Sequence, residues 1–181
     1  MDKEFSTTKN NNFHLYILYF FIFAFAGWLM ETIYSFIVLG HFTMRGFLYG
    51  PICPIYGYGA LILIIFLGKY KNNFIKLFTY AAVVCSAFEY YTSYILEVLF
   101  HSYWWDYRND FLNLNGRISI FYTVAWGVIA IIFVGFIYPF IDKKMNNIIS
   151  KVSYSKLKIL NIIALVLMVA DTILSSIKYL I

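Results

Sequence analysis

Charged side chains are scarce in this chain. Only 13% of its 181 residues are Asp, Glu, Lys or Arg, whereas 62% are hydrophobic and the mean hydropathy is +0.73. A soluble domain of this length needs far more polar surface than these residues provide. The composition therefore excludes an ordinary soluble protein and predicts an integral membrane protein.

Alternation of apolar and polar residues, the pattern of a transmembrane β-barrel, is also missing. The apolar residues form continuous windows instead, and roughly 20 such residues let a helix cross a hydrocarbon core of about 30 Å. We therefore predict an all-α, polytopic helical membrane protein with about five transmembrane helices. A polar cytoplasmic tail, residues 1–12, should precede a single integral membrane domain, residues 13–181. The predicted spans are residues 13–39, 52–68, 77–100, 118–141 and 159–177.

The lysines are distributed unevenly among the connections between these spans. Most lie in the polar start of the chain and in the connections at 69–76 and 142–158, on the same side of the membrane as the N-terminus. Basic residues favour the cytoplasmic side. We therefore expect a cytoplasmic N-terminus and an outer C-terminus in the plasma membrane of a bacterium, since the Lys-, Tyr- and Phe-rich composition suits an AT-rich bacterial genome. The net charge of +5 favours contact with membrane lipids, not nucleic acid.

Cysteine is nearly absent, and common catalytic motifs are missing. Cys53 and Cys85 lie at different depths of their predicted helices, too far apart for a disulfide, so we interpret both as buried small side chains. No G-x-x-x-x-G-K-[ST] phosphate loop occurs, nor H-E-x-x-H, C-x-x-C or G-x-S-x-G. The sequence therefore predicts no metal and no cofactor, and another chain must hydrolyse any ATP that drives this protein.

Proline and glycine are few but concentrated. The stretch RGFLYGPICPIYGYGA, residues 45–60, contains two of the three prolines and four of the ten glycines. Proline lacks a backbone donor and biases the preceding residue away from helical geometry. We therefore predict an irregular or re-entrant segment before the second span. Such backbone is tolerated at membrane depth only beside protein or water, so this segment should line a polar pocket.

Acidic residues interrupt the apolar windows at four positions: Glu31, Glu89, Glu97 and Asp171. An ionised carboxylate in hydrocarbon is costly, so these side chains should face the interior of the bundle or a wet cavity. Arg45 and Arg117, in the two predicted outer connections, are the expected counterions. The resulting pairs would either belong to a functional pocket or act as inert latches between helices.

The outer stretch HSYWWD places His101 five residues before Asp106. A histidine oriented by a carboxylate could act as a general base, and the same spacing occurs in the His-x4-Asp motif of glycerolipid acyltransferases. One histidine and one aspartate at this spacing also arise easily by chance, and an interfacial histidine beside an aromatic belt is the favoured explanation of these residues. The candidates for a catalytic residue are Glu31, Glu89, His101 and Asp106.

Four stretches carry a family resemblance: GWLMETIYS, RGFLYGPICPIYGYGA, EYYTSYILEVLFHSYWWDY and NLNGRISIFYTVAWG. Together they resemble the ABC-transporter type IV family of CmpB-like permeases, to which the vertebrate transmembrane protein 229 group is similar. The resemblance covers residues 15–140 and implies a permease that works as a homo-oligomer or with a separate ATPase subunit. With the charge pattern, it assigns these residues to the pocket: Glu31, Arg45, Gly50, Pro51, Pro54, Tyr56, Glu89, Glu97, Trp105, Asp106, Asn115 and Arg117.

Three functions follow from these observations. An ABC-transporter permease-like component would bind a polar or zwitterionic solute in an acid and arginine pocket open to the outer side. A membrane-embedded enzyme would modify phospholipid head groups or acyl chains, with a glutamate or His101 as base and Arg45 or Arg117 holding a phosphate. A non-catalytic scaffold or sensor would use the same charges for structure alone. The family resemblance favours the first.

Overall fold

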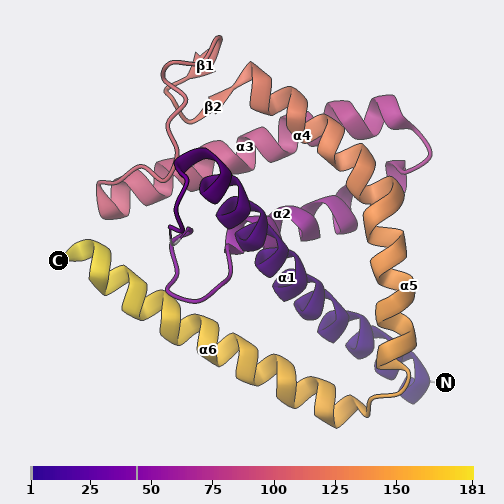
Figure 1. The fold of residues 1–181 in the computed structure, drawn as a ribbon. Helices are drawn as coiled ribbons and strands as arrows, with labels where there is room; N and C mark the ends of the chain where they lie inside the picture. Colours follow the sequence, from indigo (N-terminus) through magenta and orange to yellow (C-terminus); the bar gives the residue numbers. More distant parts are fainter. Residues whose placement is uncertain (1, 44) are drawn as a thin grey trace. The chain divides into compact units, whose positions relative to one another are not determined.

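The computed structural model describes residues 2–43 and 45–181, which are mostly helical (Figure 1). Short π-helical segments (η1, η3) and a 3-10 turn (η2) extend two of the helices, and a two-stranded hairpin lies between α3 and α4. The elements are α1 (Asp2–Leu39), α2 (Pro54–Ile62), η1 (Leu63–Leu67), η2 (Gly68–Tyr70), α3 (Phe74–Phe100), β1 (Asn113–Leu114), β2 (Ile118–Ser119), α4 (Ile120–Ile132), η3 (Phe133–Ile137), α5 (Tyr138–Ile149) and α6 (Tyr154–Leu180).

Three helices are long and apolar enough to cross a membrane: Phe13–Leu39, Ile120–Ile149 and Tyr154–Leu180. The apolar helix Pro54–Tyr70 is shorter, and α3 carries two glutamates along its apolar length. The prediction of a helical protein of membrane type is thus confirmed. The count of five spans, the single membrane domain and the orientation of the termini stay predictions.

Several helices extend beyond the predicted boundaries. α1 begins at Asp2, within the predicted tail, and the helix containing α4 continues to Ile149 instead of ending near residue 141. Pro139 lies inside this helix, where its ring would clash with the carbonyl four residues earlier in regular α-helical geometry. The π-helical η3 precedes α5 directly, and its wider turn lets the chain continue through the proline.

The connection between α1 and α2 has no helix or strand over its described residues, 40–43 and 45–53. This agrees with the irregular segment that the prolines and glycines predict. Pro54 is the first residue of α2, a position where a missing N–H leaves no helical bond unmade. The Cys53 N–H donates to the Ala24 carbonyl of α1 (3.0 Å), so the segment ends against that helix.

The chain divides into two compact units, Met1–Leu61 with Met145–Ile181, and Ile62–Lys144. In the first unit, α1 packs against both α2 and α6. A Cβ atom at Gly57 would lie 2.6 Å from the Phe20 ring, so the missing side chain allows α1 and α2 to approach closely. A Cβ at Gly59 would have no neighbour within 4 Å. Of the two glycines in this part of α2, only Gly57 therefore serves the helix contact.

In the second unit, α3 packs along α4, and Figure 1 shows the β1–β2 hairpin next to the start of α4. The hairpin is antiparallel and pairs Asn113 with Ser119 and Leu114 with Ile118. Asn115 and Gly116 both have positive φ, 53° and 68°, which is the geometry of a type I′ turn. The Arg117 N–H donates to the Leu114 carbonyl (3.0 Å), so this Asn-Gly turn positions Arg117 within the hairpin, directly before β2.

Candidate functional site

Arg117 and Glu97 form an ion pair at the last turns of α3. The guanidinium Nη2 donates to Glu97 Oε2, and the Tyr103 hydroxyl donates to Glu97 Oε1 (2.5 Å). The two side chains of the pair are only 13% and 27% exposed, respectively. One of the predicted counterion pairs is therefore present, and it joins the end of α3 to the residue that follows the hairpin turn.

Aromatic rings surround the guanidinium of Arg117. Its carbon lies 5.4 Å from the Tyr90 ring centre and 5.5 Å from that of Tyr94, both within the range of a cation–π interaction. The Asn115 amide donates to the Tyr90 hydroxyl (2.8 Å), and the Trp105 indole donates to the Arg117 carbonyl (3.0 Å). We call Tyr90, Tyr94, Glu97, Tyr103 and Arg117 the arginine cluster. The Nε of Arg117 is buried and has no hydrogen-bond partner among the described residues.

Glu89 lies two turns deeper along α3 and is 5% exposed. Its Oε1 accepts a hydrogen bond from the Tyr107 hydroxyl (2.9 Å), and its Oε2 accepts one from the Trp126 indole of α4 (2.8 Å). The Tyr107 ring stacks on Tyr122 with centroids 4.2 Å apart, and its N–H donates to the Gly116 carbonyl (2.8 Å). The buried carboxylate thus ties the connection after α3 to α3 and α4.

His101 and Asp106 do not form a hydrogen-bonded dyad in the described chain. Arg108 donates to both carboxylate oxygens of Asp106, through Nε at 2.9 and 2.8 Å and Nη2 at 2.5 Å. These hydrogen bonds lower the pKa of the Asp106 carboxyl below its usual range. His101 ends α3 with φ 50°, and its N–H donates to the Glu97 carbonyl (2.8 Å). Asp106, the carboxylate that was expected to orient His101, is therefore paired with Arg108 instead.

In the other unit, Asp171 of α6 binds the irregular segment before α2. Its Oδ1 accepts the Tyr49 N–H (2.9 Å) and its Oδ2 accepts the Gly50 N–H (2.7 Å), while the Ser175 hydroxyl donates to Oδ1 (3.0 Å). A Cβ at Gly50 would lie 2.9 Å from Asp171 Oδ2. Only glycine therefore lets the backbone approach this carboxylate, and Pro51 follows it directly.

Glu31 lies in the same unit and accepts a hydrogen bond from the Tyr56 hydroxyl (2.8 Å). The Tyr56 ring packs against Gly27, where a Cβ would come within 2.3 Å of it. Arg45, the predicted counterion on this side, forms no ion pair with any carboxylate in the part of the chain that the structure describes. The tyrosine hydroxyl thus takes the place at Glu31 that an arginine was expected to occupy.

A family model matches residues 18–176, and it is described as "Putative ABC-transporter type IV". The chain belongs to this family. The match includes every carboxylate described above, from Glu31 to Asp171. No significant match was found among the curated proteins or the solved structures.

For this family member, the predicted site residues fall into separate local sets. The second unit brings together Glu97, Asn115, Arg117 and Trp105, with Glu89 deeper on the same helix. The first unit contains the Glu31–Tyr56 bond and the Gly50–Asp171 bond, and Pro54 begins α2.

Sequence reasoning missed several partners of these residues. Among them, Trp126 and the tyrosines at 90, 94, 103 and 107 were not predicted to bind the carboxylates and Arg117, because an interfacial belt also explains aromatic residues. Asp171 was predicted to face the interior, but its backbone partners were not predicted. The spacing of Asp171 and Ser175, four residues apart on one helix face, is the signal that could have suggested a polar site there.

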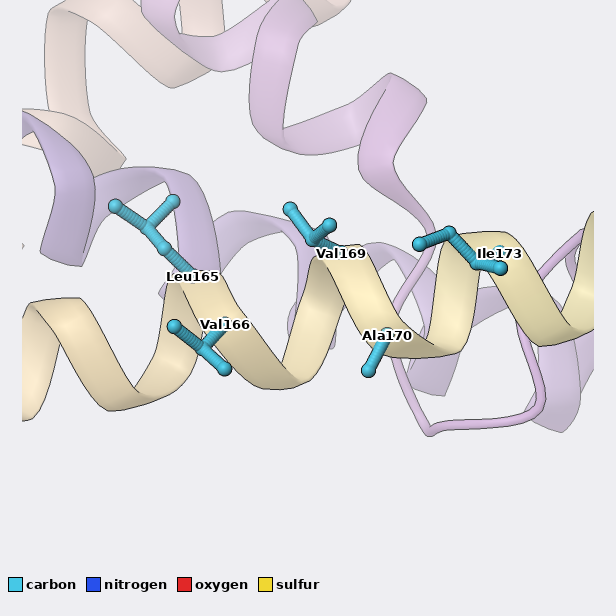
Figure 2. Close-up of a pocket in the computed structure, with 5 residues that line it drawn as sticks. All are labelled: Leu165, Val166, Val169, Ala170 and Ile173. Atoms are coloured by element: carbon cyan, nitrogen blue, oxygen red, sulfur yellow. The ribbon is translucent and has the colours of Figure 1, made fainter.

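The pocket drawn in Figure 2 is of a different kind. It is lined by apolar side chains of α6 alone: Leu165, Val166, Val169, Ala170 and Ile173. These side chains offer neither charge nor hydrogen bonds to a polar solute. Over the described residues, no group of three or more His, Cys, Asp or Glu side chains is placed to hold a metal ion.

Proposed function

We propose that this chain is a permease-like membrane component that binds a polar or zwitterionic solute on the outer side, with ATP hydrolysed by a separate subunit. Membership of the ABC-transporter type IV family and the long apolar helices support this proposal. The observation that carries it is the arginine cluster, where one cation and one carboxylate lie together among tyrosine rings.

The chemistry of the arginine cluster suits a solute with charges of both signs. A guanidinium donates parallel hydrogen bonds to a carboxylate or phosphate, and Glu97 with the tyrosine rings can bind an ammonium group. When such a solute enters, its anionic group replaces Glu97 as the partner of Arg117, and its cationic group replaces Arg117 as the partner of Glu97. Neither charge is then left uncompensated in a site that is mostly buried.

The test is native mass spectrometry of the protein purified in mild detergent. We expect a bound polar or zwitterionic molecule in the unsubstituted protein and its loss in Arg117→Gln. Arg108→Lys is the matched control, because Arg108 lies in the same connection with Asp106 as its ion-pair partner, and lysine keeps the positive charge beside the Tyr103 ring. Equal occupancy in both variants would contradict binding at Arg117.

The same spectra test the transporter assignment. A co-purifying ATPase or a homo-oligomer supports a permease, because the five predicted spans of one copy would provide only a thin wall for a translocation path. An active monomer without a partner contradicts it. A changed membrane lipid composition in a deletion strain would favour the lipid-modifying enzyme instead.

A second candidate function, a non-catalytic scaffold or sensor, has one observation in its favour. The protein itself supplies donors to both oxygens of Glu89 and of Asp171, as expected of carboxylates that hold a fold together. If this is the whole role of the polar groups, Arg117→Gln should lower thermal stability without removing any bound molecule. Loss of the bound molecule at unchanged stability would contradict it.

A further inference from the structure

Glu89 is a buried acid that the proposed solute site does not use. We propose that Glu89 is a proton-binding site, which receives its proton from the outer connection through the hydroxyl of Tyr107. The inference concerns a proton and not the solute, so its test needs no transport activity.

The surroundings of Glu89 supply hydrogen bonds but no positive charge. Its two donors, the Tyr107 hydroxyl and the Trp126 indole, are both neutral. No cation contacts Glu89 within the described residues, because Arg117 pairs with Glu97 instead. Burial without a countercharge disfavours an ionised carboxylate, and the penalty is larger inside a membrane. A proton is the simplest species that removes this charge.

The titratable groups around Glu89 are few. Cys85 lies one turn away on α3, Tyr107 comes from the outer connection, and Tyr122 of α4 stacks behind Tyr107. Of the other elements packed on α3, η1 and β2 contain no titratable side chain. η2 brings Lys69 and Tyr70, and Tyr70 stacks on Tyr80, near the opposite end of α3 from Glu97. None of these groups is a cation placed to neutralise Glu89.

The two donors differ in a way that selects where the proton binds. An indole N–H can only donate, whereas a tyrosine hydroxyl can donate or accept. When Glu89 is ionised, both groups donate to it, as the structure shows. When a proton binds to Oε1, the new carboxyl O–H donates to the Tyr107 oxygen, and Trp126 continues to donate to Oε2. The same residues therefore serve both protonation states. The Tyr107 O–H breaks as its proton passes to Oε1, and the phenolic O–H re-forms with a proton from a hydronium ion on the outer side, which leaves water.

Tyr107 also provides the route. It lies in the connection between α3 and the hairpin, which is predicted to be on the outer side, and its hydroxyl reaches the buried carboxylate directly. Tyr107 stacks on Tyr122, and its N–H bonds to Gly116. The hydroxyl is therefore held in place between the surface connection and Glu89.

Infrared spectroscopy of the purified protein at neutral pH tests this proposal, because a protonated carboxyl group has a C=O stretch separate from that of a carboxylate. We expect the unsubstituted protein to show such a band and Glu89→Gln to lose it. Glu97→Gln is the matched control on the same helix and should keep the band, since Glu97 is paired with Arg117. Identical carboxyl bands in Glu89→Gln and the unsubstituted protein would overturn the proposal.

A second variant keeps the test decisive if Glu89→Gln does not fold. Tyr107→Phe preserves the ring that stacks on Tyr122 and removes only the hydroxyl. Carbon-13 labelling of glutamate in the unsubstituted protein assigns the band to a glutamate carboxyl group. We then expect Tyr107→Phe to shift the frequency of this band and to slow the exchange of the carboxyl proton for deuterium in heavy water. An unchanged frequency and exchange rate would show that Tyr107 neither bonds the proton nor carries it.

Discussion

At the scale of single residues, the two arginines of the connection between α3 and α4 differ in environment although both pair with a carboxylate. The Arg117–Glu97 pair is mostly buried and lies among tyrosine rings, whereas the side chains of Arg108 and Asp106 are 66% and 37% exposed. An exposed pair is screened by water and contributes little, while removing one partner of a shielded pair leaves the other charge uncompensated.

We therefore expect Arg117→Gln to lower the thermal unfolding midpoint in detergent more than Arg108→Gln does. The substitution removes the cation of Glu97 and two cation–π contacts at once. Fluorescence-detected unfolding of both variants beside the unsubstituted protein measures the difference. Equal midpoints for the two variants would show that the shielding of Arg117 does not contribute to stability.

The lowered pKa of Asp106 makes a pH prediction at the same scale. The Arg108 hydrogen bonds lower the pKa of Asp106 in the folded protein, whereas an aspartate in an unfolded chain titrates near 3.9. The pair thus stabilises the fold when the pH is above the pKa of Asp106 in the unfolded chain. This stabilisation is lost as the pH falls through the lower pKa of Asp106 in the folded protein. Asp106→Asn should lower the unfolding midpoint at neutral pH, and the difference from the unsubstituted protein should shrink as the pH falls from about 5 to below the unfolded value of about 3.9. A difference that stays constant over this range would exclude the ion pair as its cause.

At the scale of elements, the segment before α2 is held by its backbone. The N–H groups of Tyr49 and Gly50 both donate to the Asp171 carboxylate, as donors in an anion-binding backbone turn do. The Phe47 ring stacks on Tyr179, and the Lys178 ammonium lies 4.9 Å from the Tyr49 ring centre. The glycine and proline pattern thus produces a segment that is fixed to the last helix.

Gly50→Ala tests this attachment. Its Cβ would lie 2.9 Å from Asp171 Oδ2, so the carboxylate must move and release at least one N–H. We expect a destabilisation of about 1–2 kcal/mol, the usual cost of an unsatisfied donor. Gly59→Ala is the matched control, because a Cβ there has no neighbour within 4 Å. It should stabilise α2 by about 0.5–1 kcal/mol, and equal effects of the two substitutions on the unfolding midpoint would contradict the Asp171 contact.

The elements also show how far the sequence determines this structure. Continuous apolar windows predicted where the helices lie, because a helix in hydrocarbon must satisfy its own backbone. They did not predict the continuation to Ile149, since Pro139 normally ends or bends a helix and the η3 segment that accommodates it leaves no clear pattern in the sequence.

At the site, charge alone predicted a carboxylate partner for Arg117. The hydroxyl partner of Glu31 and the donors to Glu89 could be identified only from the folded structure, because tyrosine and tryptophan are expected at many membrane positions.

At the scale of the whole molecule, the number of spans depends on the helix Pro54–Tyr70. Seventeen residues at about 1.5 Å each give a length of about 25 Å, less than the ~30 Å of a typical hydrocarbon core. Crossing is still feasible with local thinning of the bilayer. If this helix crosses, residues before and after it lie on opposite sides of the membrane, as the distribution of lysines predicts.

Labelling of single introduced cysteines in intact cells decides this point. His41 and Asn72 are exposed and lie on either side of the helix, while the native Cys53 and Cys85 are buried and give a low background. We expect His41→Cys to react with a membrane-impermeant thiol reagent, and Asn72→Cys to react only after the cells are permeabilised. Asn109→Cys, in the exposed connection after α3, should behave like His41→Cys because α3 returns the chain to the outer side. Equal labelling of His41→Cys and Asn72→Cys would show that Pro54–Tyr70 does not cross. The orientation of every later helix would then be reversed, including the side from which Arg117 and Tyr107 are reached.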